Sequence, residues 1–186
     1  MAQPHHDSID GVVAAMQVRL AGLTPELESR REFLGTYQRT TIAVGDAVSG
    51  GLFEDGPWVA AWDVAFANLY LAALDADLGG RRVPRPWRLA FDAPPELRPL
   101  QHVLLGINAH INYDLPQALL AVISDEDFAD PAIVERRRRD HERIDGVLSG
   151  RVAAEDDELA TRSARTLLDR VPVSYTHLTL PTILRV

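Results

Sequence analysis

The sequence predicts an all-α protein, a single-domain helical bundle of five to six helices. Three observations support this prediction. Apolar residues recur at the three- and four-residue spacing of amphipathic helices along most of the chain. The alternation of apolar and polar residues that is typical of a half-buried strand is not convincing anywhere before the C-terminus. With 186 residues, the chain is long enough to bury the core of one domain.

The first three helices are predicted from their end signals as well as from their apolar spacing. Residues 8–22 follow an N-cap at Ser8 or Asp7 and repeat apolar side chains on one face. Residues 24–48 open with a Thr24 N-cap, a proline and acidic residues, which suit the first turn of a helix. Residues 56–78 form the third helix. A pair of glycines ends the second helix and another pair ends the third.

The second half of the chain is predicted to be helical after an irregular connection. Residues 79–99 contain five prolines, which predicts a Pro-rich crossing without regular structure. The stretch "QHVLLGINAHINYDLPQALL" (101–120) forms the fourth helix, and residues 131–149 and 154–170 form two more. These helices complete one domain over residues 1–171.

The last fifteen residues differ in composition from the rest of the chain. The segment "PVSYTHLTLPTILRV" (172–186) is rich in threonine and broken by proline. It resembles translated adapter sequence at the end of an assembled reading frame, so we expect a non-native or disordered tail. The alternative is a genuine C-terminal strand or extended arm.

Composition argues against several classes of partner. The formal net charge of −8 disfavours both a nucleic-acid surface and an anionic membrane surface. The absence of cysteine excludes disulfides and thiolate chemistry. The N-terminus lacks the pattern of a signal peptide, so we expect a cytoplasmic protein. The basic run "RRRRDHERID" (136–145) is interrupted by acidic residues, which predicts a solvated helix face with internal ion pairs.

Two helices carry almost no charge and are expected to lie together in the core. Between Pro57 and Leu74 the only charged residue is Asp63, and residues 99–113 contain none. On the helix over 101–120, His110 and Asp114 fall on the same side as the apolar stripe, which indicates that both are buried.

Burial of Asp63 motivates a functional site. A buried carboxylate costs several kcal/mol unless it is paired, hydrogen-bonded or bound to a metal, so we expect Asp63 to lie against His110, His102 or an ion held with them. The candidate site residues are Asp63 and His102 for catalysis, Asn108 and Tyr70 for contact with a cofactor, and His110, Asp114 and Asp63 for a divalent metal such as zinc. In the alternative, Asp63, His110, Asn108 and Tyr70 form a closed hydrogen-bond network that only fixes the register of the helices.

The same two helices carry a family resemblance. The segments "FEDGPWVAAWDVAFANLYLAAL" and "QHVLLGINAHINYDLPQALL" resemble the uncharacterised bacterial family called domain of unknown function 5995, over most of residues 8–170. The matching positions are Phe53, Asp55, Asp63, Phe66, Ala67, Asn68, Tyr70, His102, Gly106, Asn108, Ala109, His110, Ile111, Asp114 and Leu115. Asp145 stands where asparagine is more usual in the family. The family has no established activity, so this resemblance implies no reaction.

A second, fainter resemblance is to the helical zinc-dependent phospholipase C and single-strand nuclease superfamily. In that superfamily a His-x-x-x-Asp on a central helix supplies zinc ligands and is followed by Gln-Pro; His110, Asp114 and Gln117 are similar to this pattern. The chain lacks the following histidine and the N-terminal tryptophan ligand of those enzymes. The resemblance implies a zinc-dependent hydrolase.

Two functional hypotheses follow. In the first, the protein is a metal-dependent hydrolase of a phosphoester or a similar small substrate, in which the ion lowers the pKa of bound water and a carboxylate acts as base. In the second, it is a non-enzymatic helical binding or scaffold protein with a structural polar core. The sequence does not indicate its oligomeric state.

Overall fold

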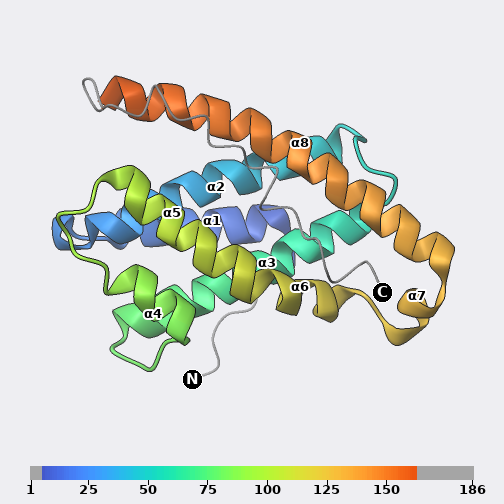
Figure 1. The fold of residues 1–186 in the computed structure, drawn as a ribbon, viewed down its shortest axis with the longest axis horizontal. Coiled ribbons are helices and arrows are strands. Elements are labelled where there is room, and N and C mark those ends of the chain that lie inside the picture. Colours follow the sequence, from blue (N-terminus) through green and yellow to red (C-terminus); the bar gives the residue numbers. More distant parts are fainter. Residues whose placement is uncertain (1–5, 163–186) are drawn as a thin grey trace.

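The computed structural model describes residues 6–162, with side chains described for residues 6–151, and this part of the chain contains helices and no strand (Figure 1). The elements are α1 (Ile9–Gly22), the 3₁₀ turn η1 (Pro25–Leu27), α2 (Glu28–Ser49), α3 (Gly56–Leu78), α4 (Arg85–Phe91), α5 (Pro99–Ala109), the π-helical turn η2 (His110–Asp114), α6 (Leu115–Val122), α7 (Asp125–Ala129) and α8 (Pro131–Arg162). The predicted all-α bundle is confirmed.

Local sequence explains where the long helices begin and end. The Ser8 hydroxyl accepts a hydrogen bond from the backbone N–H of Gly11 at the start of α1, and the Asp55 carboxylate accepts one from Trp58 at the start of α3. After α2 and α3 the chain turns through Gly51 (φ +73°) and Gly80 (φ +62°), a left-handed backbone conformation that glycine adopts without a steric penalty.

The prediction of the second half of the chain needs two corrections. Residues 79–99 are not wholly irregular, because Trp87 and Phe91, four residues apart, bury one face of the short helix α4. The two separate helices predicted over 131–149 and 154–170 are a single helix, α8, as far as Arg162. The remainder of the second of these, residues 163–170, and the predicted tail over 172–186 lie outside the described residues.

Helix α2 is the centre of the bundle. It contacts α1, α3, α5 and α8, while α3 contacts α1, α2 and α6. In Figure 1, α5 crosses in front of α3 and continues into α6, α4 lies below α5 at the lower left, and α8 runs along the upper and right edge of the bundle. The two charge-poor segments predicted to be neighbours, α3 and the α5–η2–α6 segment, do lie in contact.

The α2–α5 crossing depends on a glycine. A Cβ atom added to Gly106 would lie 2.3 Å from Cδ2 of Phe33, far inside van der Waals contact. The ring of Phe33 therefore occupies the space that any other residue at position 106 would need. This contact gives the glycine of the Gly-x-Asn-Ala-His segment a packing role.

The core has two parts, which meet along α3. One part surrounds Tyr70 and Leu74 and includes Phe33, Tyr37 and Trp87. The other surrounds Trp58 and Trp62 and is closed by side chains from α6 and α8.

Within the described residues, α3 is long and apolar enough to cross a membrane by length and composition alone. This is weak support for a membrane span, because the core helix of a helical bundle passes the same test, and 56% of the apolar window of α3 is buried inside the protein.

Candidate functional site

A π-helical turn interrupts the central helix at the predicted site. The backbone N–H of Leu115 bonds to the carbonyl oxygen of His110, five residues earlier, and Pro116 then follows without an N–H of its own. Such turns widen a helix locally and are found frequently at functional sites. Here the turn lies where His110 and Asp114 both face the core, with 3% and 1% of their surface exposed.

His110 and Asp114 form a buried hydrogen-bonded pair. Nδ1 of His110 lies 2.8 Å from Oδ2 of Asp114, and Nε1 of Trp87 donates a second hydrogen bond of 2.8 Å to the same oxygen. Because the carboxyl oxygen is the acceptor, the proton of the neutral imidazole is assigned to Nδ1 and Nε2 carries a free lone pair. This arrangement orients the imidazole and leaves a basic nitrogen on its far side.

Aromatic rings enclose the imidazole of His110. The ring of Phe66 stacks on it with a centroid separation of 3.5 Å and an interplanar angle of 4°, and Tyr37 meets it edge-on at 4.5 Å. The rings of Phe33, Tyr70 and Trp87 lie within 6.0 Å. Burial among these rings lowers the pKa of His110, and the hydrogen bond and negative charge of Asp114 oppose the effect only in part.

Several buried polar atoms in or near this cage of aromatic rings have no hydrogen-bond partner among the described residues: Nε2 of His110, Oδ2 of Asp63 and the hydroxyls of Tyr37 and Tyr70. Asp63 precedes Phe66 by three residues on α3, so both side chains lie on one side of that helix. Native proteins pair the great majority of their buried polar atoms. Unpaired atoms on adjacent elements therefore mark this region as a candidate site.

Burial also sets the protonation state of Asp63. With no charged partner to offset the loss of solvent, its pKa is raised from 3.8 to about 7. The carboxyl group is therefore able to hold or release a proton near neutral pH.

Tyr37 adds a hydroxyl group to the same region from α2. Burial raises its pKa well above the ordinary value, and the negative charges of Asp63 and Asp114 raise it further. The side chain of Thr41 opposes this rise in the pKa of Tyr37. Tyr37 was not a predicted site residue, since an aromatic residue on an amphipathic helix is indistinguishable from ordinary core in sequence.

Tyr70 belongs to the group of aromatic rings around His110. It is fully buried, its ring centroid lies 6.0 Å from that of His110, and its hydroxyl has no hydrogen-bond partner among the described residues. Burial raises its pKa.

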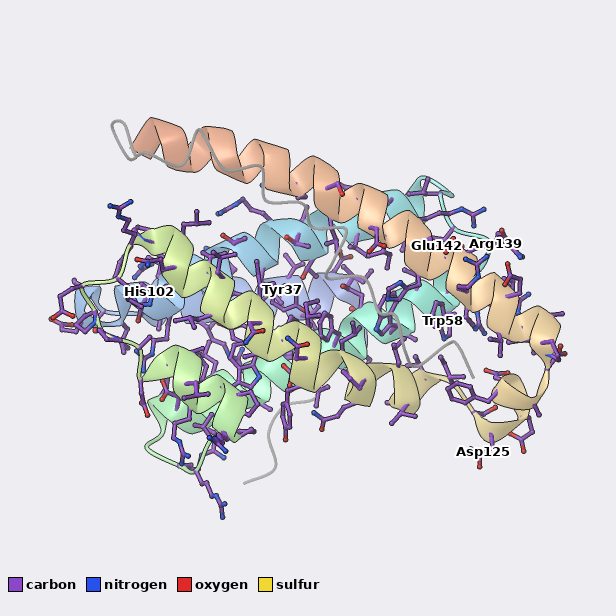
Figure 2. The ribbon with its side chains drawn as sticks, viewed as in Figure 1. Tyr37, Trp58, His102, Asp125, Arg139 and Glu142 are labelled. Carbon is purple, nitrogen blue, oxygen red and sulfur yellow. The ribbon has the colours of Figure 1, made fainter. Side chains whose placement is uncertain are left out.

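The structure does not bring His102 and Asn108 to the site. His102 is buried near the start of α5, eight residues and so about 12 Å along the helix from His110. Figure 2 shows His102 at the opposite end of the bundle from Trp58, with Tyr37 between them. Burial lowers the pKa of His102, and hydrogen bonding to the backbone of Pro95 and Leu97 opposes that shift.

Asn108 is exposed, and its side-chain oxygen accepts a hydrogen bond of 2.8 Å from Asn112 on the outer surface of the π turn. It is two residues from His110, which places it on the other side of the helix. Asn108 therefore lies apart from the buried His110–Asp114 pair.

The predicted metal set does not assemble. Across the described part of the chain, no group of three or more histidine, aspartate or glutamate side chains is arranged to hold a metal ion. His110 and Asp114 are joined directly by a hydrogen bond through Nδ1. Asp63, His110 and Asp114 therefore do not fit a three-ligand zinc centre.

The basic run on α8 has a structural role. Both oxygens of Asp140 accept backbone hydrogen bonds of 2.8 Å, one from Glu54 and one from Asp55. Arg137 pairs with Asp55 at 2.5 Å, and Arg139 binds Glu54 through two hydrogen bonds of 2.8 Å. The predicted ion pairs within α8 are present, but the run also fastens α8 to the loop before α3 (Figure 2).

The fold and the site together define an all-α helical bundle with a buried His–Asp pair at a π turn. The chain belongs to a family of unknown function, DUF5995, whose match covers residues 9–185 and so includes most of the segment predicted to be a tail. No curated protein matches the chain. No solved structure matches it either. The similarity to the zinc-dependent phospholipase C superfamily is not supported by these comparisons.

Proposed function

We propose that this protein is a hydrolase of a small substrate in which His110, oriented by Asp114, is the general base. The observation that carries the proposal is the unpaired, buried Nε2 of His110, on the side of the ring opposite the nitrogen that Asp114 holds. A histidine held through Nδ1 by a carboxylate presents Nε2 as a base, the arrangement used in many hydrolytic sites.

The chemistry follows from the protonation states. Nε2 of neutral His110 takes a proton from water, and the oxygen of that water attacks the electrophilic carbon or phosphorus of the substrate. Asp63 retains a proton up to about pH 7 and gives it to the leaving-group oxygen as the bond to that oxygen breaks. The imidazolium then returns a proton to Asp63. The proposal assigns no step to a metal, because the predicted ligands do not form a metal-binding group.

Access to Nε2 requires movement, since His110 is enclosed by rings on several sides. Helix α4 is the natural element to move. It has seven residues, follows a glycine-containing turn, and supplies Trp87 to both the aromatic box and Asp114. Opening and closing of short covering elements is a common way of admitting substrate.

A second candidate, a non-enzymatic protein with a structural polar core, is favoured by the completeness of this enclosure. The Trp87–Asp114–His110 hydrogen bonds join α4 to the π turn and would fix their register without any chemistry. The two candidates differ in the effect that they predict for His110→Gln on hydrolytic activity.

The test is hydrolysis of p-nitrophenyl acetate, p-nitrophenyl phosphate and bis-p-nitrophenyl phosphate at neutral pH, with and without a chelator. We expect turnover of at least one substrate, unaffected by the chelator. His110→Gln should lower kcat by about 100-fold or more. Asn108→Ala, an exposed change on the same helix, should leave kcat unchanged.

If none of the three substrates is turned over, or if His110→Gln keeps full activity, the result would count against the hydrolase and favour the structural candidate. Turnover that is abolished by the chelator would instead return the metal-dependent hypothesis.

A further inference from the structure

An open pocket beside α4 has arginines as half of its lining residues. Its volume is about 300 Å³, and its lining residues are Arg82, Val83, Pro84, Arg85, Arg88 and Tyr113. Three arginine residues therefore line one concavity in a chain whose net charge is −8. The volume lies at the lower end of the range of small-molecule sites.

The three arginines differ from most others in the described part of the chain. Arg19 and Arg30 pair with aspartates of α3, and the arginines of α8 pair with acids of α8 or of the loop before α3. Among the described residues, no ion pair or side-chain hydrogen bond involves Arg82, Arg85 or Arg88. Like charges held together without a counter-charge repel one another, and an anion between them removes that cost.

The backbone beneath the pocket is held in place by buried neighbours. Val83 and Trp87 are both buried, and Trp87 is hydrogen-bonded to Asp114. Arg85 and Arg88 are three residues apart, so they lie on one face of α4. Tyr113, from the π turn, also lines the pocket. These contacts hold α4, with Arg85 and Arg88, against the bundle while α4 covers the His110 site.

We propose that this pocket binds a phosphomonoester group. Guanidinium groups match the oxygens of phosphate with paired, charge-assisted hydrogen bonds. A doubly charged group of compact size suits three cations around one small concavity better than a single carboxylate does. The Tyr113 hydroxyl adds a hydrogen-bond donor. This site is separate from the buried His110–Asp114 pair, and the inference does not depend on the proposed hydrolase.

Overall charge favours a compact anion over a long polyanion. Nucleic acid contacts a protein over an extended surface, and an acidic chain repels the phosphates outside the pocket. A single phosphate group needs only the three arginines.

The test is a calorimetric titration of the full-length protein with phenyl phosphate at two salt concentrations. We expect saturable binding that weakens as salt is raised. The double variant Arg85→Gln, Arg88→Gln should bind about tenfold or more weakly, as expected from loss of charged hydrogen bonds. Arg81→Gln is the matched control, because Arg81 is exposed and adjacent but does not line the pocket.

A second arm separates a free phosphomonoester from a lipid headgroup. Vesicles of phosphatidylcholine with and without phosphatidic acid are sedimented with wild type and the double variant. If phosphatidic acid recruits the wild type but not the double variant, and phenyl phosphate also binds, the phosphomonoester that the pocket binds is a lipid headgroup. If phenyl phosphate binds but the vesicles do not, the ligand is a soluble phosphomonoester.

Both of those outcomes support the pocket. Absence of saturable phenyl phosphate binding at millimolar concentration overturns it, whatever the vesicles do. Equal weakening in Arg81→Gln and in the double variant also overturns it, because the effect would then be one of general surface charge.

Discussion

Nε1 of Trp87 donates a hydrogen bond of 2.8 Å to Oδ2 of Asp114, and both side chains are buried. The two residues belong to α4 and to the π turn, which are separated by 27 positions in sequence. The bond therefore fixes the short helix that covers the candidate site, and it fixes the carboxyl group that orients His110.

Trp87→Phe should destabilise the protein by about 2–4 kcal/mol, because it removes a hydrogen bond to a buried carboxyl group and part of a core side chain. Chemical unfolding measures the loss. Trp58→Phe is the matched control, since its indole N–H donates to the neutral backbone carbonyl of Val122 at 3.2 Å and should cost less. Equal losses in the two variants would argue against a special role for the Trp87–Asp114 bond.

Asp63→Asn should stabilise the protein in a pH-dependent way. The pKa of Asp63 is about 7 in the folded protein and near 3.8 when unfolded. Between these values the unfolded chain has lost the proton that the folded chain retains, so rising pH favours unfolding. Asparagine does not titrate. The stability of Asp63→Asn relative to wild type should therefore rise by about 4 kcal/mol from pH 4 to pH 7 and then level off.

Unfolding free energies at several pH values test this expectation. Asp46→Asn is the control, because it removes an exposed carboxyl group without changing the core. A difference between Asp63→Asn and wild type that stays constant over this pH range would show that Asp63 titrates normally and has a partner in the folded protein.

Much of the architecture was predictable because the signals are local. N-caps such as Ser8, apolar spacing and glycine pairs define the long helices without knowledge of their neighbours. Helix α4 was not predicted, because the prolines in this segment indicated an irregular connection. The helix depends on the burial of Trp87 and Phe91, which is a property of the folded core. The predicted break between residues 149 and 154 contains Gly150, but a glycine costs a helix only about 1 kcal/mol, and α8 runs through it.

The site was predictable only in part. The pairing of His110 with Asp114 follows from their spacing of four residues, and the burial of Asp63 follows from its apolar surroundings. The exposure of Asn108 also follows from helical geometry, because two residues correspond to about 200° of rotation. The contact of Trp87 with the site could not be predicted, because nothing local in the sequence links α4 to the π turn.

Gly106→Ala should destabilise the protein by about 1–3 kcal/mol or more, because the added methyl group would overlap the ring of Phe33. The effect should shrink in a Phe33→Leu background, where the ring is absent. A double-mutant cycle on unfolding free energies measures this coupling.

Gly146→Ala is the matched control for that cycle. Gly146 lies within α8 with no neighbouring atom near the position of an added Cβ, so alanine should be neutral or stabilising by about 0.5–1 kcal/mol. Strictly additive effects of Gly106→Ala and Phe33→Leu would contradict the close packing of α2 on α5.

Asp140→Asn should detach the loop before α3 from α8 and cost about 2–4 kcal/mol. Each carboxylate oxygen of Asp140 accepts one backbone N–H, from Glu54 and from Asp55. Asparagine replaces one acceptor with an amide donor, which leaves a backbone N–H facing another donor in a buried position. Hydrogen exchange should show the amides of Glu54 and Asp55 losing protection before the rest of α3.

Glu142→Gln provides the comparison, because Glu142 pairs with Arg138 on the exposed side of α8 and exposed pairs contribute little to stability. If α8 were held mainly by the number of ion pairs in its basic run, the two substitutions would have similar effects. A large loss confined to Asp140→Asn would instead show that one buried carboxylate, accepting two backbone hydrogen bonds, fastens α8 to the start of the helix that carries Asp63.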